Sequence, residues 1–180
     1  GMPKGVVWRQ EDAFFACIGG GDPMRLSGPV DRPEEVVDRI IDFDFVAFPL
    51  APMMHAAAQW TSLSWLFCGG RVVMNPGSFD ALATWKAVER HRVSTLIVVG
   101  DAMVRPLVDA WDKHGPFDTS SLFAVGSGGA PLTPSLKDRL MEILPTSMVT
   151  DGFGSSETGA QGAQRLEPGE TTKGATRFVP

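Results

Sequence analysis

The chain has 180 residues, 43% of them hydrophobic, which is enough apolar material for one sizeable core and excludes disorder throughout. Its formal charge of -5 and its pI near 5.1 exclude a general attraction for nucleic acid or anionic membranes, so a bound phosphate has to be met by local donors, lysines or a metal ion. Cys17 and Cys68 lack the spacing of a zinc site or a disulfide framework, which favours two buried thiols in a reducing compartment.

No segment predicts a membrane-spanning helix, because the longest apolar stretch, residues 45–60, is interrupted by Pro49, Pro52 and His55. Residues 1–5 form a glycine-rich turn with no element before it. This beginning indicates a piece of a longer protein.

The elements predicted before residue 45 are short. Residues 6–8 predict a strand, and a helix over residues 10–18 is ended by the glycines that follow it. Residues 22–31 predict a loop. The stretch 33–41 begins with proline and acidic residues and keeps its apolar residues on one side, which is typical of a short amphipathic helix.

From residue 45 onward, strands and helices alternate. Strands are predicted at 45–50, 71–74, 94–100, 122–125 and 147–150, and helices at 56–67, 80–92, 101–114 and 133–144. This alternation predicts an α/β fold in which β-α units form a largely parallel sheet with helices on both faces. Residues 160–180 lose apolar periodicity, so they predict a polar tail that is mobile or packs against something outside the chain.

Three loops rich in Gly, Pro, Ser or His follow predicted strands, at 51–55, 126–131 and 151–159. Because ligands bind beyond the carboxyl ends of the strands in open α/β sheets, we expect these loops to meet at one site. His55 is the one histidine at such a strand end, and its position is compatible with a functional or a structural role.

The loop at 151–159 has the composition of a nucleotide and metal site. Gly152 and Gly154 let the backbone approach a ligand closely, and Phe153 offers a flat face to a base. Glu157 offers a hard oxygen ligand suited to Mg²⁺. The same residue types also describe an ordinary turn after a strand.

Several familiar motifs are incomplete. A Walker phosphate loop requires Gly-Lys-Ser/Thr, whereas Lys4 is followed by Gly5 and Val6. Residues 154–158 lack the final glycine of the Gly-x-Ser-x-Gly elbow, which leaves an α/β hydrolase with Ser156 as its nucleophile as a weaker alternative.

Four stretches together carry a resemblance to a known family. They are Gly1-Met2-Pro3-Lys4-Gly5-Val6, Pro49-Leu50-Ala51-Pro52-Met53-Met54-His55, residues 118–122 with Gly126-Ser127-Gly128-Gly129-Ala130-Pro131-Leu132, and Gly152-Phe153-Gly154-Ser155-Ser156-Glu157. In this order they resemble the end of the phosphate loop, the stretch after it, the adenine and acyl segment, and the Tyr-Gly-x-Thr-Glu motif of the adenylate-forming enzymes. That superfamily holds acyl-CoA synthetases, luciferases and peptide-synthetase adenylation domains. The run 153–159 is most similar to actinobacterial fatty-acid-CoA ligases.

The resemblance implies a two-step reaction. A fatty acid or another hydrophobic carboxylic acid attacks ATP to give an acyl-adenylate and pyrophosphate, and the thiol of CoA then displaces AMP. It also implies that residues 1–159 are the central part of an AMP-binding domain, with residues 160–180 as the polar tail.

The resemblance further implies roles for individual residues. Lys4 would meet the β- and γ-phosphates, Ser156 would hydrogen-bond the α-phosphate, and Glu157 would bind Mg²⁺. His55 and Gly128 would border the acyl chain. The remaining residues expected at the nucleotide are Gly129, Ala130, Pro131, Asp151, Gly152, Phe153, where the family more often has tyrosine, and Gly154.

Parts of such an enzyme are absent from this sequence. The aspartate that holds the ribose, the hinge and the small C-terminal domain with its adenylation lysine are missing, so we expect that domain as a partner and expect this chain alone not to catalyse. A non-catalytic nucleotide-binding module of the same fold remains the alternative. The expected location is the cytoplasm, free or peripheral to a membrane, with no nucleic-acid partner.

Overall fold

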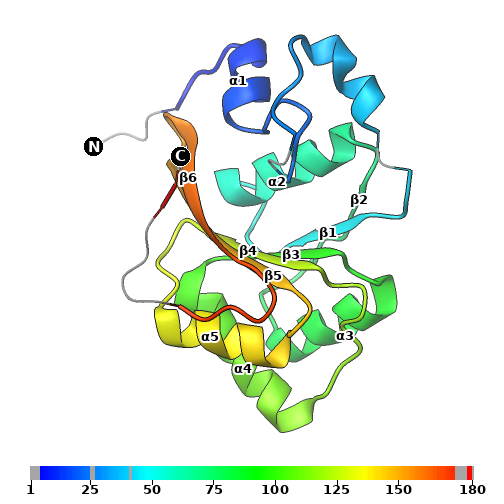
Figure 1. Ribbon diagram of the computed structural model, residues 1–180, viewed down its shortest axis with the longest axis vertical. Helices are drawn as coiled ribbons and strands as arrows, with labels where there is room; N and C mark the ends of the chain where they lie inside the picture. The colour runs from blue at the N-terminus through cyan, green and yellow to red at the C-terminus, as the bar shows by residue number, and fades with distance from the viewer. Residues whose placement is uncertain (1–4, 25–26, 41, 173–177, 180) are drawn as a thin grey trace.

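The computed structural model describes residues 5–24, 27–40, 42–172, 178 and 179. Within these ranges, six strands form one sheet in the order β2-β1-β3-β4-β5-β6 (Figure 1). Strands β1 to β5 pair in parallel, and β6 pairs antiparallel with β5, so the predicted, largely parallel sheet is confirmed. The strands are β1 Val46–Pro49, β2 Arg71–Val72, β3 Thr95–Val98, β4 Ala124–Gly128, β5 Met148–Ser155 and β6 Gly159–Leu166.

Helices cover both faces of the sheet, as predicted (Figure 1). Two lie on one side and three on the other: α1 Gln10–Ala16 with α2 Ala56–Phe67, opposite α3 Ala81–His91, α4 Gly100–His114 and α5 Pro134–Ile143. The predicted amphipathic helix forms as a tighter 3-10 helix, η1, over Pro33–Arg39. No helix in the described ranges combines the length and the apolar character that crossing a membrane requires.

Capping signals in the sequence explain the bounds of α3. The carboxylate of Asp80 accepts a hydrogen bond from the backbone N–H of Ala83 at 2.7 Å, which satisfies a free donor of the first turn. The helix ends at Arg92, which adopts a left-handed conformation with φ of 49°. These two residues begin and end the helix predicted at 80–92.

The main hydrophobic core lies between the sheet and helices α3, α4 and α5. Trp85, Leu107 and Leu140 contribute one fully buried side chain from each of these helices. Val125 on β4 and Val149 on β5 meet them from the sheet, while the residues on either side of each valine face the other side. Burial of one such side chain contributes roughly 1.5–3 kcal/mol to stability.

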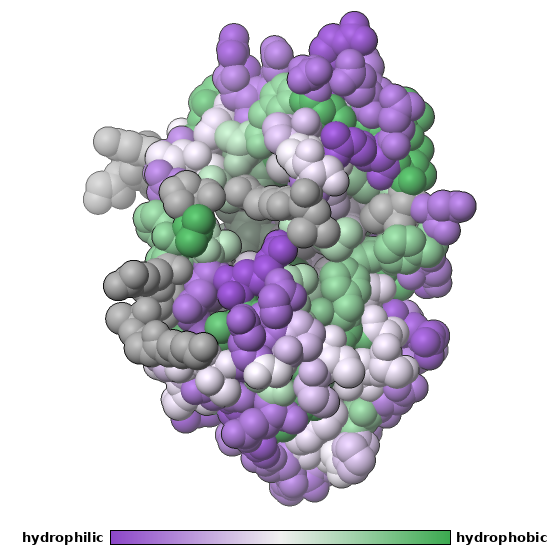
Figure 2. All heavy atoms as spheres, viewed as in Figure 1, coloured by the Kyte–Doolittle hydropathy of each residue, from purple (hydrophilic) through white to green (hydrophobic). Residues whose placement is uncertain are grey.

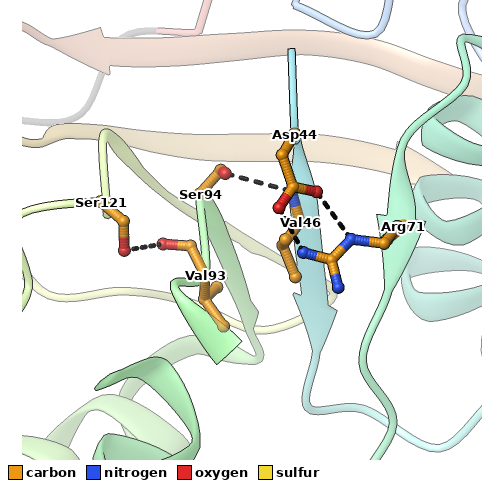
Figure 3. A network of polar contacts seen from close by, with 6 residues as sticks. All are labelled: Asp44, Val46, Arg71, Val93, Ser94 and Ser121. Carbon is orange, nitrogen blue, oxygen red and sulfur yellow. Dashed lines mark hydrogen bonds and ion pairs between the residues drawn. The ribbon is translucent and has the colours of Figure 1, made fainter. Parts of the chain in front are cut away.

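Polar contacts tie together the amino ends of the strands (Figure 3). The hydroxyl of Ser94 accepts a hydrogen bond from the backbone N–H of Val46 at 3.1 Å, and the hydroxyl of Ser121 donates to the carbonyl just before Ser94 at 3.0 Å. At the edge of the sheet, Arg71 Nε donates to Asp44 Oδ1 at 2.7 Å, one of two bonds between this arginine and this carboxylate. These contacts fix the end of the sheet that is opposite to the predicted site.

Two strands run further than the sequence predicts. Residues 126–128 belong to β4 and residues 151–155 belong to β5, although both segments have the composition of loops. The prediction of a strand at residues 6–8 is wrong, because this segment has no regular backbone pairing and is held instead by the side chain of Trp8.

The prediction of a poorly packed tail is wrong for residues 160–166. They form most of β6, because the edge of β5 presents backbone N–H and C=O groups that need hydrogen-bond partners. Leu166 at the end of β6 is buried in the main core. The domain end predicted at residue 159 therefore falls at the first residue of a strand that belongs to the sheet.

A buried ion pair links α5 to these last two strands. Lys137 Nζ lies 2.7 Å from Asp151 Oδ2, and the two side chains are only 1% and 8% exposed. The same ammonium group donates to Gln164 Oε1 at 2.8 Å. Asp151 and Gln164 face each other across β5 and β6, so one cation holds a cross-strand pair in register.

Lys137→Met is therefore expected to lower the free energy of unfolding by about 3–5 kcal/mol, because it leaves the carboxylate of Asp151 buried without its cation. The double variant Lys137→Met, Asp151→Leu removes both charges and should recover most of that loss. Denaturant unfolding followed by tryptophan fluorescence measures both. Lys113→Met, at an exposed position near the end of α4, is the matched control and should change stability by less than about 0.5 kcal/mol. Equal effects at positions 113 and 137 would contradict the ion pair's role.

Candidate functional site

A cavity of about 750 Å³ lies over the face of the sheet that carries α1 and α2. Its walls come from α2, the 17–24 segment after α1, and strands β3 to β6. Figure 2 shows the surface hollowed between the helical half that holds α1 and α2 and the half that holds the sheet, with apolar residues beside the opening. The cavity reaches the carboxyl ends of the parallel strands, which is where an open α/β sheet binds its ligands.

Small side chains on alternating positions of β4 and β5 make up much of the cavity floor. Ala124, Gly126 and Gly128 supply it from β4, and Thr150 and Gly152 supply it from β5. Val125 and Val149, which alternate with them, face the main core. Ile97 and Met148 also line the cavity, but the small residues leave space under α2 that side chains do not fill.

One wall of the cavity is apolar. It includes Trp60 on α2, together with Cys17 and Ile18 just after α1. Burial raises the pKa of the Cys17 thiol, because the charged thiolate loses hydration there. This cysteine therefore contributes a neutral, weakly polar surface and not an anion.

A tight turn between β5 and β6 forms one end of the cavity. The hydroxyls of Ser155 and Thr158 lie 2.9 Å apart, and the backbone N–H of Glu157 donates to Ser155 Oγ at 3.3 Å. Ser155 and Ser156 line the cavity. Hydroxyl oxygens and one carboxylate thus gather at a strand end.

The turn is held from outside by the beginning of the chain. The indole N–H of Trp8 donates to the carbonyl oxygen of Ser156 at 2.8 Å. Gly159, with φ of 75°, packs so closely on α1 that a Cβ atom there would overlap the carbonyl oxygen of Ala16. The segment around α1 therefore sets the position of the turn.

The structure brings together most of the residues predicted for the site. Seven of them line the one cavity, from α2, β4, the residue after β4, β5 and the turn: His55, Gly128, Gly129, Gly152, Phe153, Gly154 and Ser156. Phe153 is 53% exposed and its ring lies 5.7 Å from that of Phe178, so one face of the predicted stacking ring has an aromatic neighbour. The prediction that separated stretches converge is met for these residues.

Four predicted residues in the described part of the chain do not line the cavity: Asp151, Ala130, Pro131 and Glu157. The carboxylate of Asp151 points to the α5 side, where it is neutralised by Lys137. Ala130 and Pro131 follow β4, but the carbonyl of Pro131 accepts the backbone N–H of Asp101 at 3.0 Å, which ties this loop to the start of α4. Asp151 is therefore placed as a residue that supports β5 and not as a ligand to a base.

Glu157 is exposed in the turn, next to the cavity-lining Ser156. No group of three or more His, Cys, Asp or Glu side chains able to hold a metal ion occurs in the described part of the chain. One exposed carboxylate beside hydroxyl groups fits Mg²⁺, which keeps several waters and is commonly held by one or two carboxylates and by substrate phosphates. Lys4, predicted to meet those phosphates, lies outside the described residues.

Two features of the cavity were not predicted. Arg165 lines it from β6, and Met24 lines it from the loop after α1. Arg165 could not be recognised from the sequence because it lies in a segment without apolar periodicity.

The elbow of an α/β hydrolase is not formed, since Ser156 lies between two antiparallel strands and not between a strand and a helix.

Comparison with known proteins decides the family. The family model described as AMP-binding enzyme matches residues 1–180. The chain belongs to the AMP-binding enzymes. The resemblance found in its four motifs is thereby confirmed.

Two relatives of this AMP-binding chain are actinobacterial ligases. A medium-chain acyl-CoA ligase, Mig, from Mycobacterium avium is 44% identical across 100% of this chain and 33% of that protein. A 3-oxocholest-4-en-26-oate–CoA ligase from Rhodococcus rhodochrous is 38% identical across 97% of this chain and 32% of that protein. The chain spans about a third of the length of these relatives.

Solved structures confirm the fold of the AMP-binding chain. A long-chain-fatty-acid-CoA ligase from Archaeoglobus fulgidus matches with a TM-score of 0.60 at 19% identity, over 75% of this chain and 28% of that one. The amide bond synthetase McbA from Marinactinospora thermotolerans matches with a TM-score of 0.58 at 23% identity, over 72% of this chain and 26% of that one. At these identities the likeness concerns the fold alone.

The contact between the turn and α1 is testable with two glycines. Gly159 and Gly169 both have positive φ, 75° and 84°, but a Cβ atom at Gly169 would meet nothing within 4 Å. Both Gly→Ala variants carry the backbone strain, and only Gly159→Ala adds an overlap with Ala16, so it should lose about 1–3 kcal/mol more stability. Denaturant midpoints of the two variants measure the difference. Equal losses would show that α1 does not press on the turn.

Proposed function

We propose that the protein carrying this chain is an AMP-forming acyl-CoA ligase that activates a fatty acid or another hydrophobic carboxylic acid. In the first step a carboxylate oxygen forms a bond to the α-phosphorus of ATP, while the bond from that phosphorus to the bridging oxygen breaks and pyrophosphate leaves. In the second step the CoA thiol loses its proton to solvent and its sulfur bonds to the acyl carbon, while the bond from that carbon to the phosphate oxygen breaks and AMP leaves with the electron pair. The observation that carries the proposal is one cavity that joins an apolar trough to the Ser156–Glu157 turn.

The trough suits the acyl group. Its floor of glycine, alanine and threonine leaves room for a chain, and Trp60 and Ile18 offer apolar contact. Apolar surface removed from water contributes roughly 25 cal/mol per Å². His55, exposed just before α2, lies at the border of this trough and would contact the acid near its reacting end.

The turn suits the phosphates. The hydroxyl of Ser156 would donate to the α-phosphate, and the backbone at Gly128 and Gly129 would lie close to the nucleotide because no Cβ atom intervenes. The ring of Phe153 would stack on adenine. Lys4 would meet the outer phosphates as a compact positive charge.

Glu157 would hold Mg²⁺ with water and phosphate oxygens. The ion, when bound, offsets negative charge on the departing pyrophosphate. This chain's contribution is the carboxylate, fixed on a turn that Trp8 and α1 hold from behind. The ribose contact, the adenylation lysine and much of the CoA site would come from the rest of the protein.

Two buried, unpaired thiols support a reducing compartment, so we place the enzyme in the cytoplasm. The acid pI argues against a nucleic-acid partner. ATP, CoA and the acid are the proposed substrates.

Glu157→Gln in the full-length protein is expected to lower acid-dependent exchange of pyrophosphate into ATP by about 10- to 100-fold and to raise the Mg²⁺ concentration needed for half-maximal exchange. The substitution keeps the shape and removes the charge that a hard cation requires. Glu167→Gln, an exposed acid just after β6, is the control and should leave both quantities unchanged. If Glu157→Gln leaves the exchange rate and its Mg²⁺ dependence unaltered, Glu157 is not the Mg²⁺ ligand. If the wild type binds ATP but shows no acid-dependent exchange, the result favours a non-catalytic nucleotide-binding module.

A further inference from the structure

Arg165 lies on the cavity side of β6, as the pairing of the last two strands requires. It faces Thr150 across β5 and β6, and directly opposed residues of an antiparallel pair project to the same face. Thr150 is part of the cavity floor, and Arg165 lines the same cavity. Its neighbour Gln164 projects to the other face, toward Lys137, which agrees with this alternation.

The cavity lining is almost free of charge. Of the described residues that line it, Arg165 is the sole arginine or lysine, and Asp22 is the sole acid. Asp22 Oδ2 already accepts the backbone N–H groups of Ser27 and Gly28, both at 2.7 Å, so this acid is used by its own loop. Among the described lining residues, Arg165 thus carries the charge that is not taken up by its own loop, and the uncharged Thr150 lies opposite it.

The guanidinium of Arg165 donates through Nη2 to the carbonyl oxygen of Met24 at 2.9 Å. A guanidinium carries five N–H donors, so this bond uses one of them. Arg165 is exposed, so water can meet its other donors when the cavity is empty, and a purely hydrocarbon chain at this end offers them no acceptor. An oxygen atom at the same place accepts hydrogen bonds from a charged donor, and such bonds are stronger than those between neutral groups.

The length of β6 also indicates how far Arg165 lies from the end of the cavity that is next to the turn. Ala160 lines the cavity beside the turn, and five residue steps along β6 separate it from Arg165. At 3.4 Å per step, the backbone of Arg165 lies about 17 Å along β6 from that of Ala160. Ser156, which would hold the α-phosphate, belongs to that turn.

We propose that Arg165 selects the distal end of the acyl substrate, so that the preferred acids carry an oxygen acceptor, a ketone or a carboxylate, at the end of a long chain and far from the reacting carboxylate. This inference rests on the proposed function, because it takes the Ser156 end of the cavity as the reacting end. It names the class of acid: long, largely apolar, and polar again at its far end.

The test uses the full-length protein and straight-chain acids of graded length, each paired with a matched acid that ends in a keto group. Acyl-adenylate is trapped with hydroxylamine, and kcat/KM is measured for every pair. We expect the keto acid to be favoured about 10-fold or more at one chain length, with the preference carried by KM and absent from shorter pairs.

Arg165→Met keeps the length of the side chain and removes its donors, so the ratio of keto to methyl acid should fall to about one at that chain length. Arg165→Lys should keep part of the ratio. Arg90→Met, at an exposed position on α3, is the control and should leave the ratio as in the wild type.

If Arg165 only holds the loop at Met24, Arg165→Met will reduce kcat/KM for both members of each pair by the same factor, and the inference is overturned. If the wild type shows a keto-to-methyl ratio of kcat/KM near one at every chain length, the inference is overturned as well. If the methyl acids are still activated in that case, the proposed ligase function stands. Absence of any trapped adenylate with any acid overturns the proposed function itself and the inference with it.

Discussion

The structure depends on a difference in side-chain size between the two faces of one sheet. On β4 and β5, the face toward α3, α4 and α5 carries Val125 and Val149, which close a dense core, and the face toward α2 carries glycine, alanine and threonine with Met148 as its one large side chain. Since interiors pack to nearly crystalline density wherever side chains can meet, a hollow persists only where the chain supplies too little volume. Along the same strands, alternate residues therefore either pack in the core that stabilises the fold or line the opening for a ligand.

The ionic contacts follow the same division. Lys137 is buried on the core side, and it holds the carboxylate of Asp151 and the amide of Gln164 where large apolar residues would otherwise be expected. A buried charge pair contributes little net stability, but leaving one of its charges buried without the other is strongly unfavourable. Such a pair therefore favours one arrangement of the chain over others more than it stabilises the folded state. What it specifies here is the alignment of β5 with β6, and this alignment puts Thr150 and Arg165 side by side on the cavity side.

The sequence predicts an element well when nearby residues fix its ends, and poorly when pairing with a distant segment determines whether it forms. The helix at 56–67 was predicted to the residue, since Gly69 and Gly70 stop it locally, and Asp80 marks the next helix by its own side chain. The last half of β5 was missed because Gly152 and Gly154 have low strand propensity. It is a strand because β4 pairs with β5 as far as Gly152 and β6 pairs with it as far as Ser155.

The candidate site shows the same limit. Convergence of the strand ends was predictable from the alternation of elements, and His55, Gly128 and Ser156 do line one cavity. Asp151 was expected at the nucleotide because the family resemblance implies it, yet a period of two from the buried Val149 predicts that its side chain faces the core. Arg165 was not recognisable, because its place follows from pairing with a strand whose own extent was unknown.

The anchoring of the turn by Trp8 and by the end of α1 has an entropic consequence. A free three-residue turn samples many backbone conformations, and ordering each residue takes about 1–2 kcal/mol at room temperature. A turn already braced from its outer side has lost much of that freedom during folding. The hydroxyl and carboxylate groups it carries are thus preorganised, and a ligand that reaches them retains more of its contact free energy as affinity.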